Sequence, residues 1–186
     1  MPIHYDSPTT RQLLVDGLDQ THQAIHRDFA ALSVEELFAP QGEHWSPAEH
    51  LDHLCRSVKA VTYAFRMPKL AVMLRFGPSF GASRSFDRVV EIYRRALDDG
   101  GRAMGRYLPS DPPDTDARDE RRQQLLERWE RRGRGLQTAV FTWGDFWLDR
   151  CQVPHPLLGK MTCREILHFT LYHNVHHADR VEERRG

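Results

Sequence analysis

Apolar residues recur at intervals of three, four and seven positions over four long segments, which is the spacing of amphipathic helices. The first segment covers residues 7–32, and its apolar positions are Leu14, Leu18, Ile25, Phe29 and Leu32. Ser7 followed by Pro8 predicts the helix start, because serine caps a helix and proline fits its first turn. Ser33 caps a further short turn over residues 34–38.

The second segment begins at Ser46 and Pro47, with Glu49 placed for a capping box. Its apolar positions are Leu51, Leu54, Val58, Val61 and Phe65. The pattern continues to residue 76, and Pro68 predicts a kink within it.

Residues 77–85 are rich in Gly, Pro and Ser and predict an excursion, after which residues 86–97 form a shorter helix. The third long helix covers residues 117–149, with its seam at Leu126, Trp129, Leu136, Val140, Trp143 and Trp147. Gly133 takes one place in that seam, which indicates a kink or a close helix approach.

Two loops separate the later elements, over residues 109–116 and 154–160. Thr162 caps the last helix, which runs to residue 183, and Glu165 takes the capping-box position. No period-two run of strand length occurs. The pattern predicts an all-α protein, an up-down four-helix bundle with one additional short helix, forming a single domain over residues 1–186.

Composition narrows the function classes. The 186 residues carry 26 basic and 26 acidic side chains, and this neutrality argues against a nucleic-acid or membrane-surface partner. No leader and no stretch long enough to span a bilayer is recognisable. The three cysteines are widely spaced and form no C-x-x-C pair, which favours a reducing compartment, so we expect a cytoplasmic protein.

Histidines are the informative residues. Seven of the eleven lie in two short windows, at the start of the second long helix and in the last helix: His44, His50, His53, His168, His173, His176 and His177. Two histidines four residues apart on a helix point the same way, so His173 and His177 can present two imidazoles to one ion. They fall in a sector of roughly 80° with Ile166, Thr170 and Val181, so we expect them to face the interior.

A third ligand must come from another helix, and periodicity favours His50 over His53. His50 lies roughly 70° from the centre of the apolar stripe and His53 roughly 130°. Against this, the face of His53 continues through small residues that leave room for a neighbouring helix: Ser57, Ala60 and Ala64.

Two motifs more than a hundred residues apart resemble the DinB-like (YfiT-like) metalloprotein family, a group of four-helix bundles. Residues 45–54, WSPAEHLDHL, resemble its second-helix signature, and residues 155–177, HPLLGKMTCREILHFTLYHNVHH, resemble its last-helix signature. The resemblance implies that His53, His173 and His177 hold a metal ion. One departure is Arg180, where the family often has a glutamine shortly after the last histidine.

The resemblance implies one divalent ion, most commonly zinc or nickel, in a cleft at one end of the bundle. The function it implies is a metal-dependent enzyme acting on a small molecule, either a transferase using a low-molecular-weight thiol or a hydrolase. Two alternatives remain: a non-catalytic metalloprotein, and a stress-related helical dimerisation module. We also expect a homodimer.

Several other side chains have an ordinary structural explanation. Glu49 suits a helix cap better than a base that acts beside the metal ligands, and His22 suits the core better than a fourth ligand position. Trp45 and Tyr172 are candidates to line the cleft, whereas nothing near Cys55 indicates an activated thiolate. The roles of His50 and His176 stay open.

Overall fold

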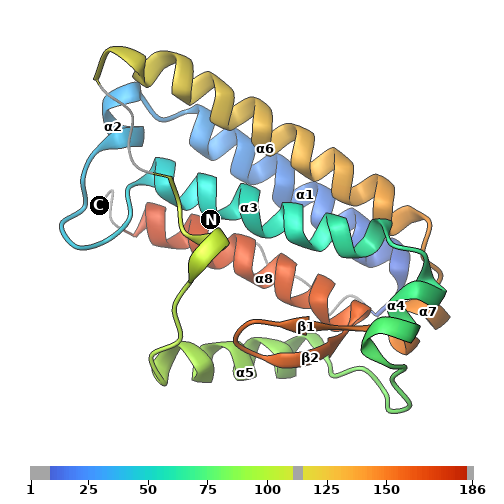
Figure 1. Ribbon diagram of the computed structural model, residues 1–186. Helices are drawn as coiled ribbons and strands as arrows, with labels where there is room; N and C mark the ends of the chain where they lie inside the picture. Colours follow the sequence, from blue (N-terminus) through green and yellow to red (C-terminus); the bar gives the residue numbers. More distant parts are fainter. Residues whose placement is uncertain (1–8, 111–114, 184–186) are drawn as a thin grey trace.

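Four long helices form the body of the protein in a computed structural model that describes residues 9–110 and 115–183. They are α1 (Arg11–Ala30), α3 (Pro47–Arg66), α6 (Arg118–Phe141) and α8 (Cys163–Glu182). Helices α1 and α3 each pack against both α6 and α8, so the four surround one core (Figure 1). The predicted all-α class and four-helix bundle are confirmed.

The helix directions differ from a simple alternating order. Asp52 of α3 pairs with Arg128 of α6, and farther along both helices the Arg66 guanidinium lies beside Gly135, so α3 and α6 run parallel. A parallel pair needs a long connection. Here the connection contains α4 (Lys69–Phe76), α5 (Phe86–Asp98) and the 3₁₀ turns η1 (Gly105–Tyr107) and η2 (Thr115–Ala117).

The helix starts are local features of the sequence. Ser33, Ser46 and Thr162 cap α2 (Val34–Phe38), α3 and α8. Each forms a capping box, which was expected at Ser46 and Thr162 but not at Ser33. The predicted start at Ser7 and Pro8 lies outside the described residues. Within them α1 begins at Arg11, because the Thr10 side chain accepts a hydrogen bond from the Leu13 backbone N–H.

Two predicted long helices are interrupted. The second divides at Pro68, where α3 ends and α4 begins, because proline donates no helical hydrogen bond and disfavours helical backbone at the preceding residue. The third ends at Phe141, and α7 (Asp145–Arg150) follows after a break at Gly144. The described chain therefore has more short helices than the one we expected.

A small hairpin replaces the loop expected over residues 154–160. Strands β1 (Gln152–His155) and β2 (Gly159–Thr162) pair antiparallel, with Gln152 opposite Thr162. Four-residue strands are too short to show a period-two pattern, so the sequence pattern does not reveal them. Gly159 adopts a φ of 71°, a left-handed conformation that favours glycine in the turn.

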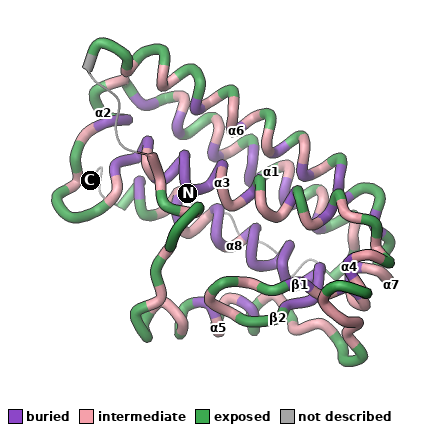
Figure 2. Tube along the Cα trace, in the orientation of Figure 1, coloured by how far each residue is buried: buried purple, intermediate pink, exposed green. Residues whose placement is uncertain are grey.

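The buried faces of the helices meet in one core, and exposed positions follow their outer sides (Figure 2). Two tryptophans bond to neighbouring helices there: Trp129 Nε1 of α6 donates to the His22 carbonyl at 3.1 Å, and Nε1 of Trp143, which follows α6, donates to the Phe65 carbonyl at 2.8 Å. Gly133 allows α1 and α6 to approach closely, since a Cβ at this position would collide with the His22 ring. The close-approach interpretation of Gly133 is confirmed.

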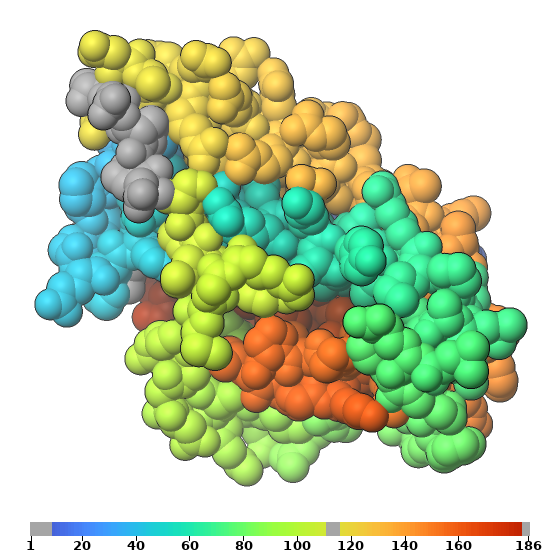
Figure 3. Space-filling view, in the orientation of Figure 1, coloured from blue at the N-terminus to red at the C-terminus, as the bar shows by residue number. Residues whose placement is uncertain are grey.

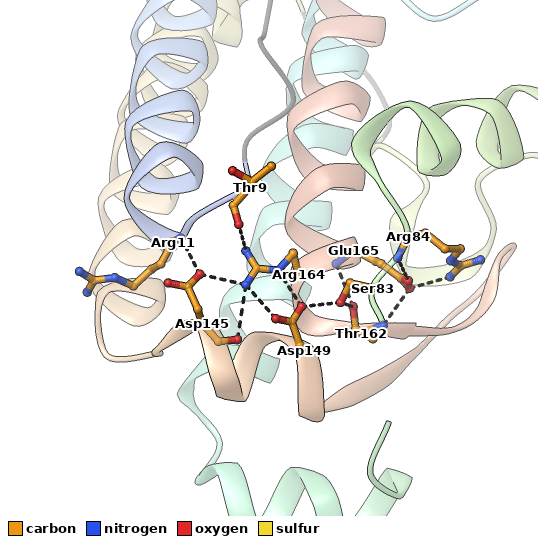
Figure 4. A network of polar contacts seen from close by, with 9 residues as sticks. All are labelled: Thr9, Arg11, Ser83, Arg84, Asp145, Asp149, Thr162, Arg164 and Glu165. Atoms are coloured by element: carbon orange, nitrogen blue, oxygen red, sulfur yellow. Dashed lines mark hydrogen bonds and ion pairs between the residues drawn. The ribbon is translucent and has the colours of Figure 1, made fainter. Parts of the chain in front are cut away.

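A polar network at the start of α8 joins four segments (Figure 4). The buried Arg164 guanidinium donates to Asp145 and Asp149 of α7 and to the Thr9 carbonyl. Glu165 accepts from the Arg84 backbone at 2.7 Å and forms an ion pair with its side chain. The network therefore ties the excursion before α5 to the bundle. Among the described helices, none is long and apolar enough to cross a membrane.

Candidate metal centre

Three histidines from two helices meet between α3 and α8. These helices run antiparallel, and the packing sets His53 of α3 against His173 and His177, which are one turn apart on α8. Their candidate ligand atoms all lie within 4.8 Å of one another, and the His53 and His173 Nε2 atoms are 3.1 Å apart. Bonds of about 2.0–2.1 Å to one tetrahedral ion place ligand nitrogens roughly 3.3 Å apart. The group can therefore hold a metal ion.

The orientation of His53 is set by a loop that follows α5. The His53 Nδ1 atom lies 2.7 Å from the Tyr107 backbone carbonyl oxygen. A carbonyl only accepts hydrogen bonds, so Nδ1 carries the proton and the lone pair is on Nε2, which points toward His173. This is the arrangement by which proteins commonly orient a metal-binding imidazole.

His50 lies behind His177. The Nδ1 atoms of these two rings are 2.7 Å apart, so one donates and the other accepts, and Nε2 of His177 stays available to an ion. Periodicity favoured His50 as the third member of the group, whereas the structure brings His53 beside His173 and gives His50 a supporting contact.

The three rings are almost completely buried, with exposed fractions of 4%, 5% and 8% for His53, His173 and His177. Burial lowers the pKa of His173 and His177 well below 6.5, and the neighbouring histidines lower it further. Burial also lowers the pKa of His53, although the Tyr107 carbonyl and Asp52 oppose the shift. The rings are therefore neutral at neutral pH, which is the form that binds metals.

Aromatic rings surround the group. Trp45 stacks on His177 with ring centroids 6.0 Å apart and lies 5.0 Å from His53. Tyr93 of α5 and Phe169 of α8 lie 6.0 and 4.9 Å from His173. Trp45 was anticipated from the sequence. Tyr93 was missed, and its only signal was a place one turn after Val89 on the apolar face of the shorter helix.

The remaining candidates have structural contacts. The Glu49 carboxylate accepts from the backbone N–H and hydroxyl of Ser46, both at 2.7 Å, as a helix cap. Tyr172 accepts from Arg94 and lies beside Tyr93 and His176. Burial raises the pKa of Cys55 to about 12, so its thiol is not activated.

Two further histidines are not members of the group. His22 packs on Trp129 in the core, with ring centroids 4.6 Å apart, as expected for a core histidine. His176 contacts the edge of His177 but faces Tyr93, and burial together with Arg180 lowers its pKa to about 4. Arg180, the residue that departs from the family signature, is thus close enough to lower the pKa of His176.

A sequence profile of the DinB superfamily matches residues 7–179, so the chain belongs to this superfamily. No curated protein matches the chain significantly. A crystal structure of the colibactin self-resistance protein ClbS in complex with a dsDNA is similar to it, with a TM-score of 0.52, 11% identity and 95% of each chain covered. At this identity the similarity concerns the fold.

This neighbour corrects one expectation. We expected no nucleic-acid partner because the net charge is zero, yet a protein of this fold is seen with duplex DNA. The exclusion was wrong because net charge sums over the whole chain and does not report how charges are distributed on its surface.

Proposed function

We propose that His53, His173 and His177 bind one divalent metal ion and that the protein is a metal-dependent enzyme acting on a small molecule. One observation carries the proposal: three buried, neutral imidazoles from two helices point their nitrogens at one place. Three protein ligands leave a coordination position open, which is typical of catalytic sites and unlike the closed shell of structural ones.

The donor set suits zinc or nickel, since imidazole binds both and availability decides between them. A divalent ion supplies a Lewis acid that activates water or stabilises a thiolate. The protein contributes orientation, because Tyr107 and His50 hold two of the rings by their Nδ1 atoms. Trp45 and Tyr93 contribute apolar walls beside the group.

The nucleophile in this proposal comes from outside the chain. Cys55, Cys151 and Cys163 are buried, and burial raises the pKa of each thiol, so all three stay protonated. A low-molecular-weight thiol or water therefore attacks a small electrophile in a transferase or hydrolase reaction. The same free thiols favour a reducing compartment, and we propose the cytoplasm.

Elemental analysis of untagged protein tests the metal assignment. We expect one equivalent of zinc or nickel in the wild type and in His26→Ala, a control on α1, and none in His53→Ala. Retention of the ion in His53→Ala contradicts the assignment and directs attention to His50. Turnover is tested by screening electrophiles with and without added thiol, before and after chelation.

A non-catalytic metal site is the second candidate, and one observation favours it: the three ligands come from antiparallel helices, so an ion would also join α3 to α8. In that case chelation lowers the melting temperature strongly while no thiol adduct or hydrolysis product forms in any screen. A stress-related dimerisation module that binds no metal predicts no stoichiometric ion at all.

We also propose that the chain forms a homodimer. Large apolar side chains are exposed on α4 and just after it, namely Leu70, Leu74 and Phe80, and such patches commonly mark interfaces. Light scattering should report a dimer for the wild type and a monomer for Leu74→Glu. A monomeric wild type contradicts the pairing.

We also propose that the whole chain forms one domain, which a single cooperative unfolding transition would support.

A further inference from the structure

Helix α6 carries seven arginines and four acidic residues, and the acidic residues leave one flank of the helix free. The acidic residues of this helix lie toward its outer side and toward α1, at roughly 0–100° on a helical wheel counted from Asp119: Asp119, Glu120, Glu127 and Glu130. The flank that faces α3, at roughly 180–220°, carries Arg121, Arg128 and Arg132. This flank carries no acidic residue of α6, so it is positively charged although the net charge of the chain is zero.

Helix α3 presents a matching flank. Arg56, Lys59 and Arg66 follow one another at helical spacing on the side that meets α6. The two rows lie next to each other, because Arg56, Arg121 and Arg128 all contact the Asp52 carboxylate. We call the six cations together the α3–α6 basic stripe, and the two helices lie side by side on the face shown in Figure 3.

One carboxylate does not balance the stripe. Asp52 is buried and already shared by three arginines, whose side chains are 20–35% exposed. Lys59, Arg66 and Arg132 have no acidic partner among the described residues, and the Arg132 Nε is buried without a hydrogen bond there. Like charges set side by side repel one another, so this arrangement suits an external anion.

The shape of the stripe favours a linear polyanion. Arg56 and Arg66 are ten residues apart, and Arg121 and Arg132 eleven, so each row extends about 15 Å along its helix. Four to five phosphates of one DNA strand cover that length, at about 3.4 Å each along the axis. Single strands are usually bound on several aromatic platforms, whereas exposed Tyr63 is the one aromatic side chain between the α3 cations.

We propose that the α3–α6 basic stripe binds the phosphate backbone of double-stranded DNA without reading its sequence. Arginine pairs with phosphate through two parallel N–H groups, which explains why arginines dominate the stripe. The stripe lies on the flank of α3 that carries Asp52 and Arg56, and the histidine group lies on the flank facing α8. The inference therefore does not depend on the metal centre.

Fluorescence anisotropy with a labelled duplex of about 20 base pairs tests the proposal across a salt series. The test variant combines Lys59→Gln, Arg66→Gln and Arg132→Gln, which leaves the Asp52 contacts in place. Its matched control combines Arg88→Gln, Arg95→Gln and Arg131→Gln, which removes three exposed arginines outside the stripe. Circular dichroism and urea unfolding establish that both variants are folded.

We expect saturable binding by the wild type, with a slope of log K against log salt of about −3 to −5. The test variant should bind at least about tenfold more weakly, with a slope reduced by about 2–3. The control should stay within about threefold of the wild type. Absence of duplex binding, or equal losses in test variant and control, overturns the proposal.

A second experiment measures binding to vesicles of anionic phospholipid. Binding to the vesicles without binding to the duplex assigns the stripe to a membrane surface and also overturns the proposal.

Discussion

The His53 imidazole and the Tyr107 backbone carbonyl are joined by a 2.7 Å hydrogen bond between residues 54 positions apart. The loop that carries this carbonyl also contains Ser110, whose backbone N–H and hydroxyl both donate to Asp52. Asp52 precedes His53 on α3. Asp52 holds the loop by accepting hydrogen bonds from Ser110, and the loop in turn orients the His53 ring through the Tyr107 carbonyl. This coupling makes the loop a support for the candidate metal centre.

Ser110→Ala should therefore weaken metal binding without removing a ligand. Loss of the hydroxyl removes its contacts with Asp52 and Arg56 and leaves only the backbone N–H of residue 110 to donate to Asp52, so the loop positions the His53 ring less firmly. We expect the metal dissociation constant to rise up to about tenfold, as for other outer contacts of metal ligands. Competition with a chromophoric chelator measures it. Ser57→Ala, on the same helix, is the control and should leave the constant unchanged.

How far the sequence predicts the fold can be judged from individual elements. The starts of α3 and α8 were predicted because a capping box is local and needs no knowledge of packing. The parallel course of α3 and α6 was not, because it depends on where the long connection crosses the bundle. The hairpin was missed because four residues carry too little periodicity.

The candidate site was predictable to a similar extent. The pair His173 and His177 follows from helical spacing alone. His53 required the resemblance to a family, because its wheel position favours solvent until α8 packs against that face. Tyr93 and Tyr107 come from the connection between α3 and α6, and no local signal states which residues of such a segment return to the bundle.

Arg164→Met should destabilise the fold while leaving metal content intact. The substitution removes hydrogen bonds from a side chain that is 9% exposed, and bonds to charged groups contribute about 1.5–3 kcal/mol. We expect a loss of about 2–3 kcal/mol in urea unfolding. Residue 164 precedes His173 by nine positions, about 13 Å along the helix, so the centre itself is unaffected.

The control for that experiment is Arg88→Met, which breaks an exposed ion pair with Glu91 on α5. Such pairs contribute about 0–1 kcal/mol. Equal losses for the two variants would contradict a special role for the buried network.

Gly133→Ala should be destabilising although alanine favours helices by about 1 kcal/mol over glycine. The added methyl collides with the His22 ring, and we expect a net loss of about 1–3 kcal/mol. A double-mutant cycle with His22→Ala checks the cause. Most of the loss should disappear when the ring is absent, whereas additive losses would place the strain elsewhere.

His22 should also make the fold sensitive to acid. Burial lowers the pKa of His22 from 6.5 to about 4, with His26 acting in the same direction. Between these values the unfolded chain binds a proton that the folded chain does not, so stability falls as pH decreases from about 6.5 to about 4 and is retained above 6.5. The full effect is at most about 3 kcal/mol.

His22→Gln cannot take up this proton, so urea unfolding from pH 7.5 to 4.5 should show a shallower loss of stability than in the wild type. The metal-site histidines titrate equally in both proteins and cancel in the difference, so identical pH profiles would show that His22 is protonated in the folded core.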